Sequence, residues 1–181
     1  MIRFVGIVLL CIAASVAYGL VHDQITIRIA PEYFTVLHPQ ILPSDTPLTV
    51  LALAWGVIAT WWVGLILGLI LAVASCVGSR PKLSAGDLIR AVAWLLLVMA
   101  IGAALSGMAG YLLGVYQLLI PADIVTERVR PGHINCVFAA GGAHLASYII
   151  GFIGGIVVAL KAWIRRGKLA SSLEVQPANH R

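Results

Sequence analysis

Residues 48–77 read LTVLALAWGVIATWWVGLILGLILAVASCV and contain no Asp, Glu, Lys or Arg. A helix rises about 1.5 Å per residue, so roughly 20 apolar residues cross the hydrocarbon core of a bilayer. A water-soluble fold has no means of hiding an apolar stretch of this length. We therefore predict a membrane-spanning helix over residues 48–77.

Three further stretches are similarly apolar: residues 2–20, 88–115 and 136–164. The chain of 181 residues is 61% hydrophobic and only 10% charged, whereas soluble domains carry about a quarter charged residues. We expect an all-α membrane protein, a four-helix transmembrane bundle that forms a single domain over residues 1–165. Residues 166–181 predict a short, polar, disordered cytoplasmic tail.

Lys and Arg are distributed unequally between the connections. Nine lie at the two ends of the chain and around the connection between the second and third spans, against three in the other two connections. Because cytoplasmic loops carry the excess of Lys and Arg, we expect both termini in the cytoplasm and a multi-pass protein of the bacterial cytoplasmic (inner) membrane. The net charge of +5 does not predict a nucleic-acid partner, since the bases flank the spans instead of clustering on a soluble face.

The first apolar stretch has an alternative interpretation. Arg3, a short apolar run and the small residues at 13–17 resemble a secretory signal peptide that would be cleaved. We favour a retained helix, because the run continues through Tyr18 and Leu20 without an Ala-x-Ala cleavage site.

Small side chains recur every four residues in the second span, and again in the third. On a helix this spacing forms a stripe that lets two backbones approach closely. A compact bundle accounts for the stripes, and they also suit a non-catalytic structural or assembly subunit, either as a homo-oligomer or with a partner in a membrane complex. The predicted packing residues are Gly56, Thr60, Gly64, Gly68, Gly102, Ser106, Gly110, Gly151 and Gly155.

His144 is the clear ionisable residue inside a span. If the fourth helix begins near Cys136, the His144 side chain lies about 12 Å below its outer end. At 100° per residue it shares a small, polar face with Ser147 and Tyr148, so this face should turn inward. Ionisable groups inside a span indicate a functional site by default. The alternative is a neutral histidine that is hydrogen-bonded to a neighbouring helix.

Residues 22–39, HDQITIRIAPEYFTVLHP, follow the first span on the predicted outer side. Ile25, Ile27 and Ile29 alternate with polar residues, which predicts a short extended segment. Residues 124–130 could pair with it as a strand, or could instead form a helical turn. Pro31 suits the first position of a brief helix over residues 31–35. We therefore expect a short ordered extracytoplasmic cap over the helix ends.

Acids and histidines predicted on the outer side form the candidate site. Two carboxylates with imidazoles suit a divalent transition metal such as Zn, Mn or Fe. The same groups could exchange protons, because desolvation moves their pKa values toward neutrality. The alternative is that these polar residues form a hydrogen-bond network with a purely structural role, which fixes the cap. The candidate ligands are Asp23, Glu32 and His144, with His38 and His133 as further candidates, supported by Gln24, Tyr33, Ser147 and Tyr148.

No known catalytic motif occurs in the chain. It has no HExxH, ExxH, GxSxG or phosphate-binding glycine loop. The sequence therefore predicts no reaction and leaves open whether the protein is an enzyme. Proton or small-solute transport is a further alternative.

Several segments resemble a group of small, four-span, uncharacterised bacterial membrane proteins. Members share a YGxx(N/H)DQ segment followed by PEYFT, found here at residues 18–24 and 31–35. ATWWVGL at 59–65 and AHLASYIIGFIGG at 143–155 are also similar to the later segments of the group. The resemblance implies no established activity, but it implies that Asp23, Glu32 and His144 belong to one constellation. Relatives often have Asn in place of His22, which weakens His22 as an obligatory ligand.

Overall fold

The computed structural model describes residues 1–118 and 123–175. All regular structure in these residues is helical, so the prediction of an all-α fold is confirmed. The elements are α1 (Ile2–Ile29), α2 (Pro31–Thr35), α3 (Leu48–Ile58), α4 (Trp61–Cys76), α5 (Ala85–Val115), α6 (Asp123–Arg128), η1 (Pro131–His133) and α7 (Ile134–Val175).

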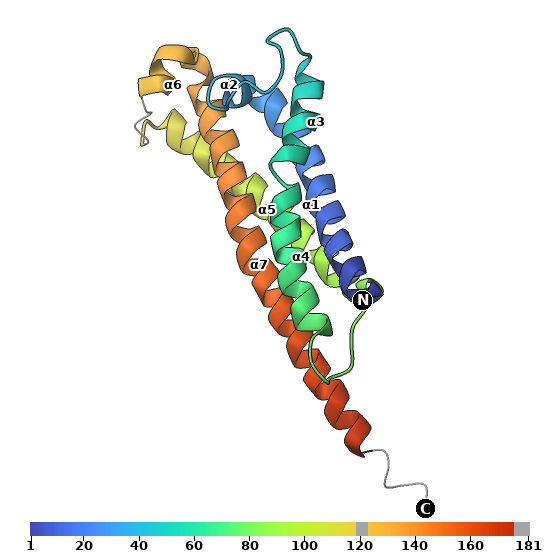
Figure 1. The fold of residues 1–181 in the computed structure, drawn as a ribbon. Coiled ribbons are helices and arrows are strands. Elements are labelled where there is room, and N and C mark those ends of the chain that lie inside the picture. Colours follow the sequence, from blue (N-terminus) through green and yellow to red (C-terminus); the bar gives the residue numbers. More distant parts are fainter. Residues whose placement is uncertain (119–122, 176–181) are drawn as a thin grey trace, which may run out of the picture.

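Four helical segments of the described chain are long and apolar enough to cross a membrane. They are Ile2–Ile29, Leu48–Cys76, Ala85–Val115 and Pro131–Leu173. The segments run side by side as a bundle, and short elements cover one end (Figure 1). We call this the α2 end, since α2, α6 and residues 36–47 lie there. The opposite end carries the N-terminus and residues 77–84, and we call it the Arg166 end.

The segment after the first span is not extended, as the alternating isoleucines had predicted. α1 continues without interruption to Ile29, and the side chain of Ile27 is fully buried while Ile25 and Ile29 are exposed. The helix ends at Ala30, whose backbone is extended (φ −140°, ψ 81°), because Pro31 disfavours helical geometry in the preceding residue.

Two further expectations concern the remaining short elements. The brief helix predicted over residues 31–35 is confirmed as α2. Residues 123–128 form the helix α6. Of the two interpretations of this segment, the helical turn is therefore correct and the strand is wrong. At the other end of the molecule, α7 continues as a helix to Val175, so the segment 166–175 is not the disordered tail that was expected. Residues 176–181 of that predicted tail lie outside the described part of the chain.

Glycines let the helices approach until their backbones touch. A Cβ added to Gly19 of α1 would lie 2.5 Å from the carbonyl oxygen of Gly56 in α3, and one on Gly64 of α4 would lie 2.7 Å from that of Cys11. α5 and α7 pack against each other in the same way. Among the residues singled out from the sequence, Gly68 faces Val8, Gly102 faces Ile150, Ser106 faces Gly142, Gly110 faces Phe138, Gly151 faces Met99, and Gly155 faces Leu67.

The second span is interrupted near its middle. α3 ends at Ile58 and α4 begins at Trp61, with Thr60 in a non-helical conformation between them. Backbone outside a helix is tolerated at membrane depth only where it is buried in protein or lines a cavity. Here the Thr60 hydroxyl donates to the Gly56 carbonyl at 2.6 Å, and the Tyr148 hydroxyl of α7 donates to the Ala59 carbonyl at 3.3 Å. The break is therefore turned toward the interior of the bundle.

Arg166 fixes the opposite end of the bundle. Its side chain is fully buried, and its guanidinium donates to the carbonyl oxygens of Ala74, Val77, Arg80 and Pro81 at 2.7–3.0 Å. Ala74 and Val77 lie at the C-terminal end of α4, where the helix dipole favours a positive charge. α7 thereby holds both the end of α4 and the connection to α5.

Candidate metal centre

Three potential ligands meet near the α2 end. His22 and Asp23 come from α1 and His144 from α7, and one ligand atom of each lies within 4.8 Å of the others. The site is secluded, since the side chain of Asp23 is 6% exposed and that of His144 is 13% exposed. No other such group of three or more occurs in the described residues. Asp23 and His144, both expected from the sequence, are thus brought together with His22.

The proton of the His144 ring is fixed by a backbone carbonyl. Nδ1 of His144 lies 2.8 Å from the carbonyl oxygen of Ala140, and because a carbonyl only accepts hydrogen bonds, Nδ1 carries the proton. In a neutral ring Nε2 then has a bare lone pair, and it faces Oδ1 of Asp23 at 3.2 Å. Two lone pairs at this distance repel each other unless a proton or a metal ion lies between them.

His22 supplies a nitrogen without a partner. Its Nε2 atom is buried and makes no hydrogen bond within the described chain, and leaving such a group unsatisfied costs about 1–3 kcal/mol. The ring stacks on Tyr18, with centroids 5.4 Å apart, and meets the edge of His144 at 4.5 Å. An orphaned imidazole nitrogen beside a carboxylate and a second imidazole fits a metal-ligand set.

The donor set fits a transition metal in its geometry as well. With metal–ligand distances of about 2.0–2.1 Å, the 3.2 Å between His144 Nε2 and Asp23 Oδ1 subtends an angle of about 100° at an ion, near the tetrahedral value. The hydrogen bond from Nδ1 of His144 to Ala140 is the outer-shell contact that orients a ligating histidine.

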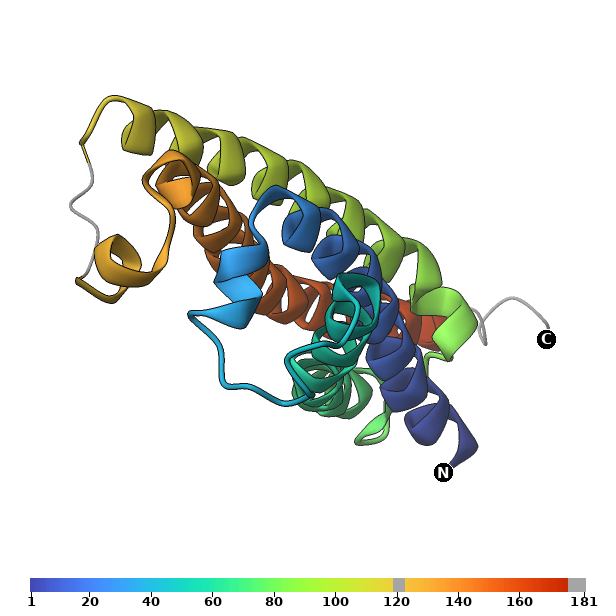
Figure 2. The same ribbon diagram turned by 90° about the horizontal axis from the view of Figure 1, so that it is seen from above.

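Aromatic residues of α2 cover the centre. The rings of Tyr33 and Phe34 lie 4.7 Å and 5.7 Å from that of His144. Burial, together with smaller contributions from the nearby Tyr148 and Asp23, raises the pKa of Tyr33 to about 12. The Tyr33 hydroxyl therefore stays protonated near neutral pH. Figure 2 shows α2 lying across the end of the bundle beside α1 and α7.

His38 belongs to this cover and not to the ligand group. Its Nδ1 atom is 2.7 Å from the carbonyl oxygen of Tyr33, and its ring packs against Tyr33 and Trp55 with centroid distances of 4.8 Å and 4.9 Å. Its ring nitrogen therefore fixes the loop after α2. Gln24 lies at the rim, where it donates to the Thr49 carbonyl at 2.8 Å and accepts from Arg28 at 2.7 Å.

Glu32 forms a second polar cluster. Its carboxylate lies 3.1 Å from Arg130 Nη2 and 3.0 Å from His133 Nδ1. Burial alone raises the pKa of Glu32, but hydrogen bonds from its own backbone amide, Arg130 and His133 bring that pKa below its usual 4.5. The carboxylate is thus ionised and already has two partners. The single constellation implied by the family resemblance is divided in the structure between this cluster and the His22, Asp23 and His144 group.

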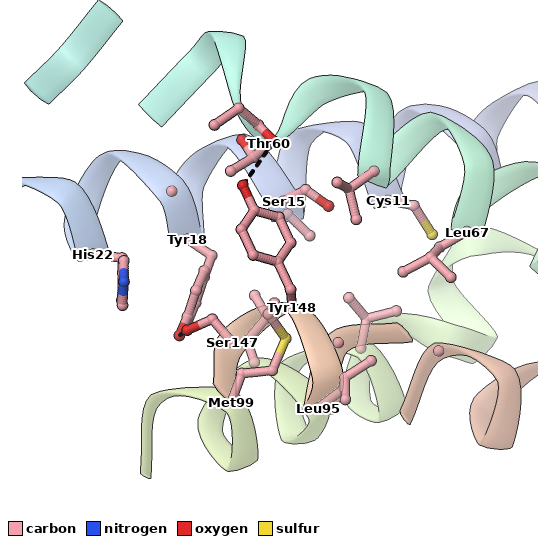
Figure 3. Close-up of a pocket in the computed structure, with 18 of the residues that line it drawn as sticks. Cys11, Ser15, Tyr18, His22, Thr60, Leu67, Leu95, Met99, Ser147 and Tyr148 are labelled. Atoms are coloured by element: carbon pink, nitrogen blue, oxygen red, sulfur yellow. Dashed lines mark hydrogen bonds between the residues drawn. The ribbon is translucent and has the colours of Figure 1, made fainter. Parts of the chain in front are cut away.

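An internal cavity of about 100 Å³ extends from the centre into the bundle. Tyr18, His22 and Asp23 line one end, and apolar residues such as Leu67 and Leu95 line the rest (Figure 3). This volume is well above the roughly 10–15 Å³ that one water molecule needs, so the cavity has room for several waters. It therefore gives the centre space for a small ligand.

Ser147 and Tyr148 lie on this cavity. The Ser147 hydroxyl donates to the Ala143 carbonyl at 2.9 Å and pairs with the Tyr18 hydroxyl at 2.8 Å. Tyr148 points across the cavity to the break between α3 and α4 (Figure 3). Both residues support the polar end of the cavity, and neither belongs to the three-residue ligand group.

His22 was not among the ligands predicted from the sequence, although one sequence feature indicates its position. Tyr18 and His22 are four residues apart, so they share a face if the helix continues past Leu20. Because an extended segment was predicted after Leu20, the sequence did not indicate that Tyr18 and His22 share a helix face. Once α1 is known to reach Ile29, the spacing places both rings on the side that meets α7.

The four apolar spans and the secluded polar centre define a multi-pass α-helical membrane protein with a candidate metal site. Comparisons with protein families, with curated proteins and with solved structures found no match to this chain.

Proposed function

We propose that this chain is a metal-binding protein of the bacterial cytoplasmic membrane, and that it holds one divalent transition metal through His22, Asp23 and His144. One observation carries the proposal: Nε2 of His144 lies 3.2 Å from the Asp23 carboxylate, beside a buried His22 Nε2 that has no hydrogen-bond partner in the described chain. Two imidazoles and one carboxylate suit Zn, Mn or Fe.

Three protein ligands would leave a coordination position open. Sites of this kind act on a bound water or substrate, in contrast to structural zinc sites, which are closed by four protein ligands. A metal at such a position supplies Lewis-acid activation. The chain itself contributes the orientation of His144 through Ala140, the exclusion of bulk water by Tyr33 and Phe34, and the space of the internal cavity.

The excess of Lys and Arg at the Arg166 end supports an orientation with both termini in the cytoplasm. In this orientation the centre lies in the outer half of the membrane. Its seven-residue distance from the end of α1 at Ile29 corresponds to a depth of about 10 Å.

The metal content of the purified full chain tests the proposal. The wild type should hold a close to stoichiometric transition metal by plasma mass spectrometry, and His144→Ala and Asp23→Asn should lose it, because each removes a ligand. His133→Ala is the matched control, since that histidine also contacts a carboxylate but lies in the Glu32 cluster. Equally negligible metal in all four proteins would overturn the proposal.

A second candidate function is proton transfer through the same centre. The contact between His144 and Asp23 at 3.2 Å is also compatible with a shared proton, and buried carboxylate–histidine pairs occur in membrane proton relays. In proteoliposomes this function requires proton flux in the wild type and its loss in Asp23→Asn, without any bound metal. Flux that survives Asp23→Asn would exclude this role for the pair.

A further inference from the structure

A groove runs along the outside of the bundle between α1 and α5, on the side of the α2 end. It has a volume of about 590 Å³, within the range of about 300–1,000 Å³ that is typical of small-molecule sites. α7 forms its floor. The lining is mostly apolar. α1 contributes the larger side chains of Ile25 and Ile29, while α5 and α7 contribute small residues, among them Ala103, Ala104, Gly107 and Ala143.

The groove lies within the membrane-spanning part of the chain. α1 packs mainly on α3 and α4, so beside α5 it leaves a space that the small side chains do not fill. Ile25 and Met108 on its edges are 57% and 61% exposed, and in a bilayer this exposure is to lipid chains. The natural occupant of such a space is therefore an aliphatic chain that arrives from within the membrane.

One wall of the groove is polar and leads to the candidate metal centre. Tyr18 and His22 line both the groove and the internal cavity, so their stacked rings separate the two. His22, whose buried Nε2 has no hydrogen-bond partner in the described chain, is one of the two residues of this wall. A chain in the groove would thus bring a polar head group next to His22.

The net charge of the proposed metal centre favours one kind of head group on a chain in the groove. A divalent metal bound by two neutral imidazoles and the Asp23 carboxylate leaves a net charge of +1, and an uncompensated charge is costly at this depth. A carboxylate head next to His22 neutralises that charge. An uncharged head would leave the centre cationic.

We propose that the groove between α1 and α5 binds a long-chain carboxylate, with its chain along Ala104 and Ala103 and its carboxylate beside His22 at the metal centre. The ligand of the centre is then a single-chain amphiphile that enters sideways from the bilayer. This inference rests on the proposed function for the charge of the centre, and it deepens that function by naming the class of ligand.

Photolabelling of the full chain in phosphatidylcholine nanodiscs tests the inference. The probe is a palmitic acid analogue with a diazirine in its chain, and the labelled peptides are mapped by mass spectrometry. The label should concentrate on the groove segments of α1 and α5 and should be displaced by palmitate. Hexadecane, which has the same chain length without a head, should displace it poorly.

Ala104→Phe should lower the labelling of the groove about tenfold, equivalent to about 1.4 kcal/mol of binding, because the ring fills the space of the chain. Ala93→Phe is the matched control, since Ala93 is also exposed on α5 but does not line the groove. Ala100→Phe, also in the groove, is a second filled variant in case the first does not fold.

Labelling spread evenly over the exposed face of α5, or unchanged by both filled variants, would overturn the groove as a site. Displacement by hexadecane as strong as by palmitate would overturn the assignment of the head. Metal content measured on the same samples separates the two proposals. Loss of label with retained metal in Ala104→Phe supports both, whereas a groove-specific label on a wild-type protein without metal contradicts the metal function and leaves the chain site standing.

Discussion

At the scale of single residues, the ring of His144 shows how a buried side chain is prepared for a ligand. Its Nδ1 atom is held by the Ala140 carbonyl, and its Nε2 atom faces Asp23 at 3.2 Å. Because α1 supplies Asp23 and α7 supplies His144, a cation between them also ties the two helices together, so metal binding should stabilise the fold.

The Glu32 cluster leads to a prediction about pH. The pKa of Glu32 in the folded protein lies below the usual 4.5, so ionised Glu32 stabilises the fold. This contribution is complete above the unfolded pKa and is lost as the pH falls through the folded pKa. Glu32→Gln should therefore speed amide hydrogen exchange in α2 near neutral pH, and the difference from the wild type should vanish well below pH 4.5.

The control for this experiment is exchange in α4, which Glu32 does not contact and which should be equal in both proteins at each pH. A difference in α2 that persists in acid would assign the effect to the amide substitution itself and not to the charge of Glu32.

At the scale of elements, α7 forms hydrogen bonds with the second span at two separate levels of the bundle. The break at Ala59 and Thr60 leaves backbone groups that need partners inside the protein, and α7 supplies one through Tyr148. Seventeen positions further along the chain, Val77 follows the end of α4 and is held by Arg166 of the same α7. Discontinuous spans frame binding sites in many transporters, and here the break borders the internal cavity.

Arg166 carries the second prediction. Arg166→Leu removes four hydrogen bonds to backbone carbonyls and leaves these groups without the charge that satisfied them. We expect the free energy of unfolding to fall by about 3 kcal/mol, since bonds to charged groups contribute about 1.5–3 kcal/mol each and are not additive. Detergent-based equilibrium unfolding, followed by circular dichroism, measures the change.

Arg165→Leu is the matched control on the neighbouring residue. Arg165 is half exposed, and its hydrogen bonds within the described residues go to Asp87. Exposed ion pairs contribute about 1 kcal/mol or less. Equal destabilisation by the two substitutions would show that loss of positive charge, and not the buried contacts, decides the stability of this end.

At the scale of the whole molecule, four spans place the two chemically distinct ends of the bundle on opposite sides of a membrane. The α2 end holds the centre, its aromatic cover and the Glu32 cluster, while the Arg166 end holds most of the Lys and Arg residues. The centre lies nearer to the α2 end than the apolar part of the cavity does.

The expected orientation gives the third prediction. Ser44→Cys, in the exposed loop after α2, should react with a membrane-impermeant maleimide in intact cells, because the proposed orientation places the α2 end outside. Ser171→Cys, exposed near the end of α7, should react only after permeabilisation. The wild type, with its three native cysteines, provides the background. The opposite pattern of labelling would invert the orientation.

Much of the architecture could be predicted because it depends on local properties. The four spans follow from apolar runs, and the helix at 31–35 follows from a proline in its first position. Asp23 and His144 stand out because ionisable groups are rare in such runs. The extended segment at residues 25–29 was wrong because three alternating isoleucines suit a strand and the end of a helix equally well, and continuity with the preceding turns of α1 decided the outcome. The resemblance to a group of four-span bacterial proteins stays a prediction.

The sequence by itself determined that this chain forms apolar helices long enough to span a membrane, and that these helices contain few ionisable groups. Both features can be predicted because the cost of burying charge in hydrocarbon acts on each residue separately. Only the tertiary structure decided which of those groups meet. His22 meets His144 where α1 contacts α7, whereas Glu32 of α2 pairs with Arg130 in the connection that precedes α7. Such pairings depend on the rotation and separation of helices that are distant in the chain, and no local pattern records them.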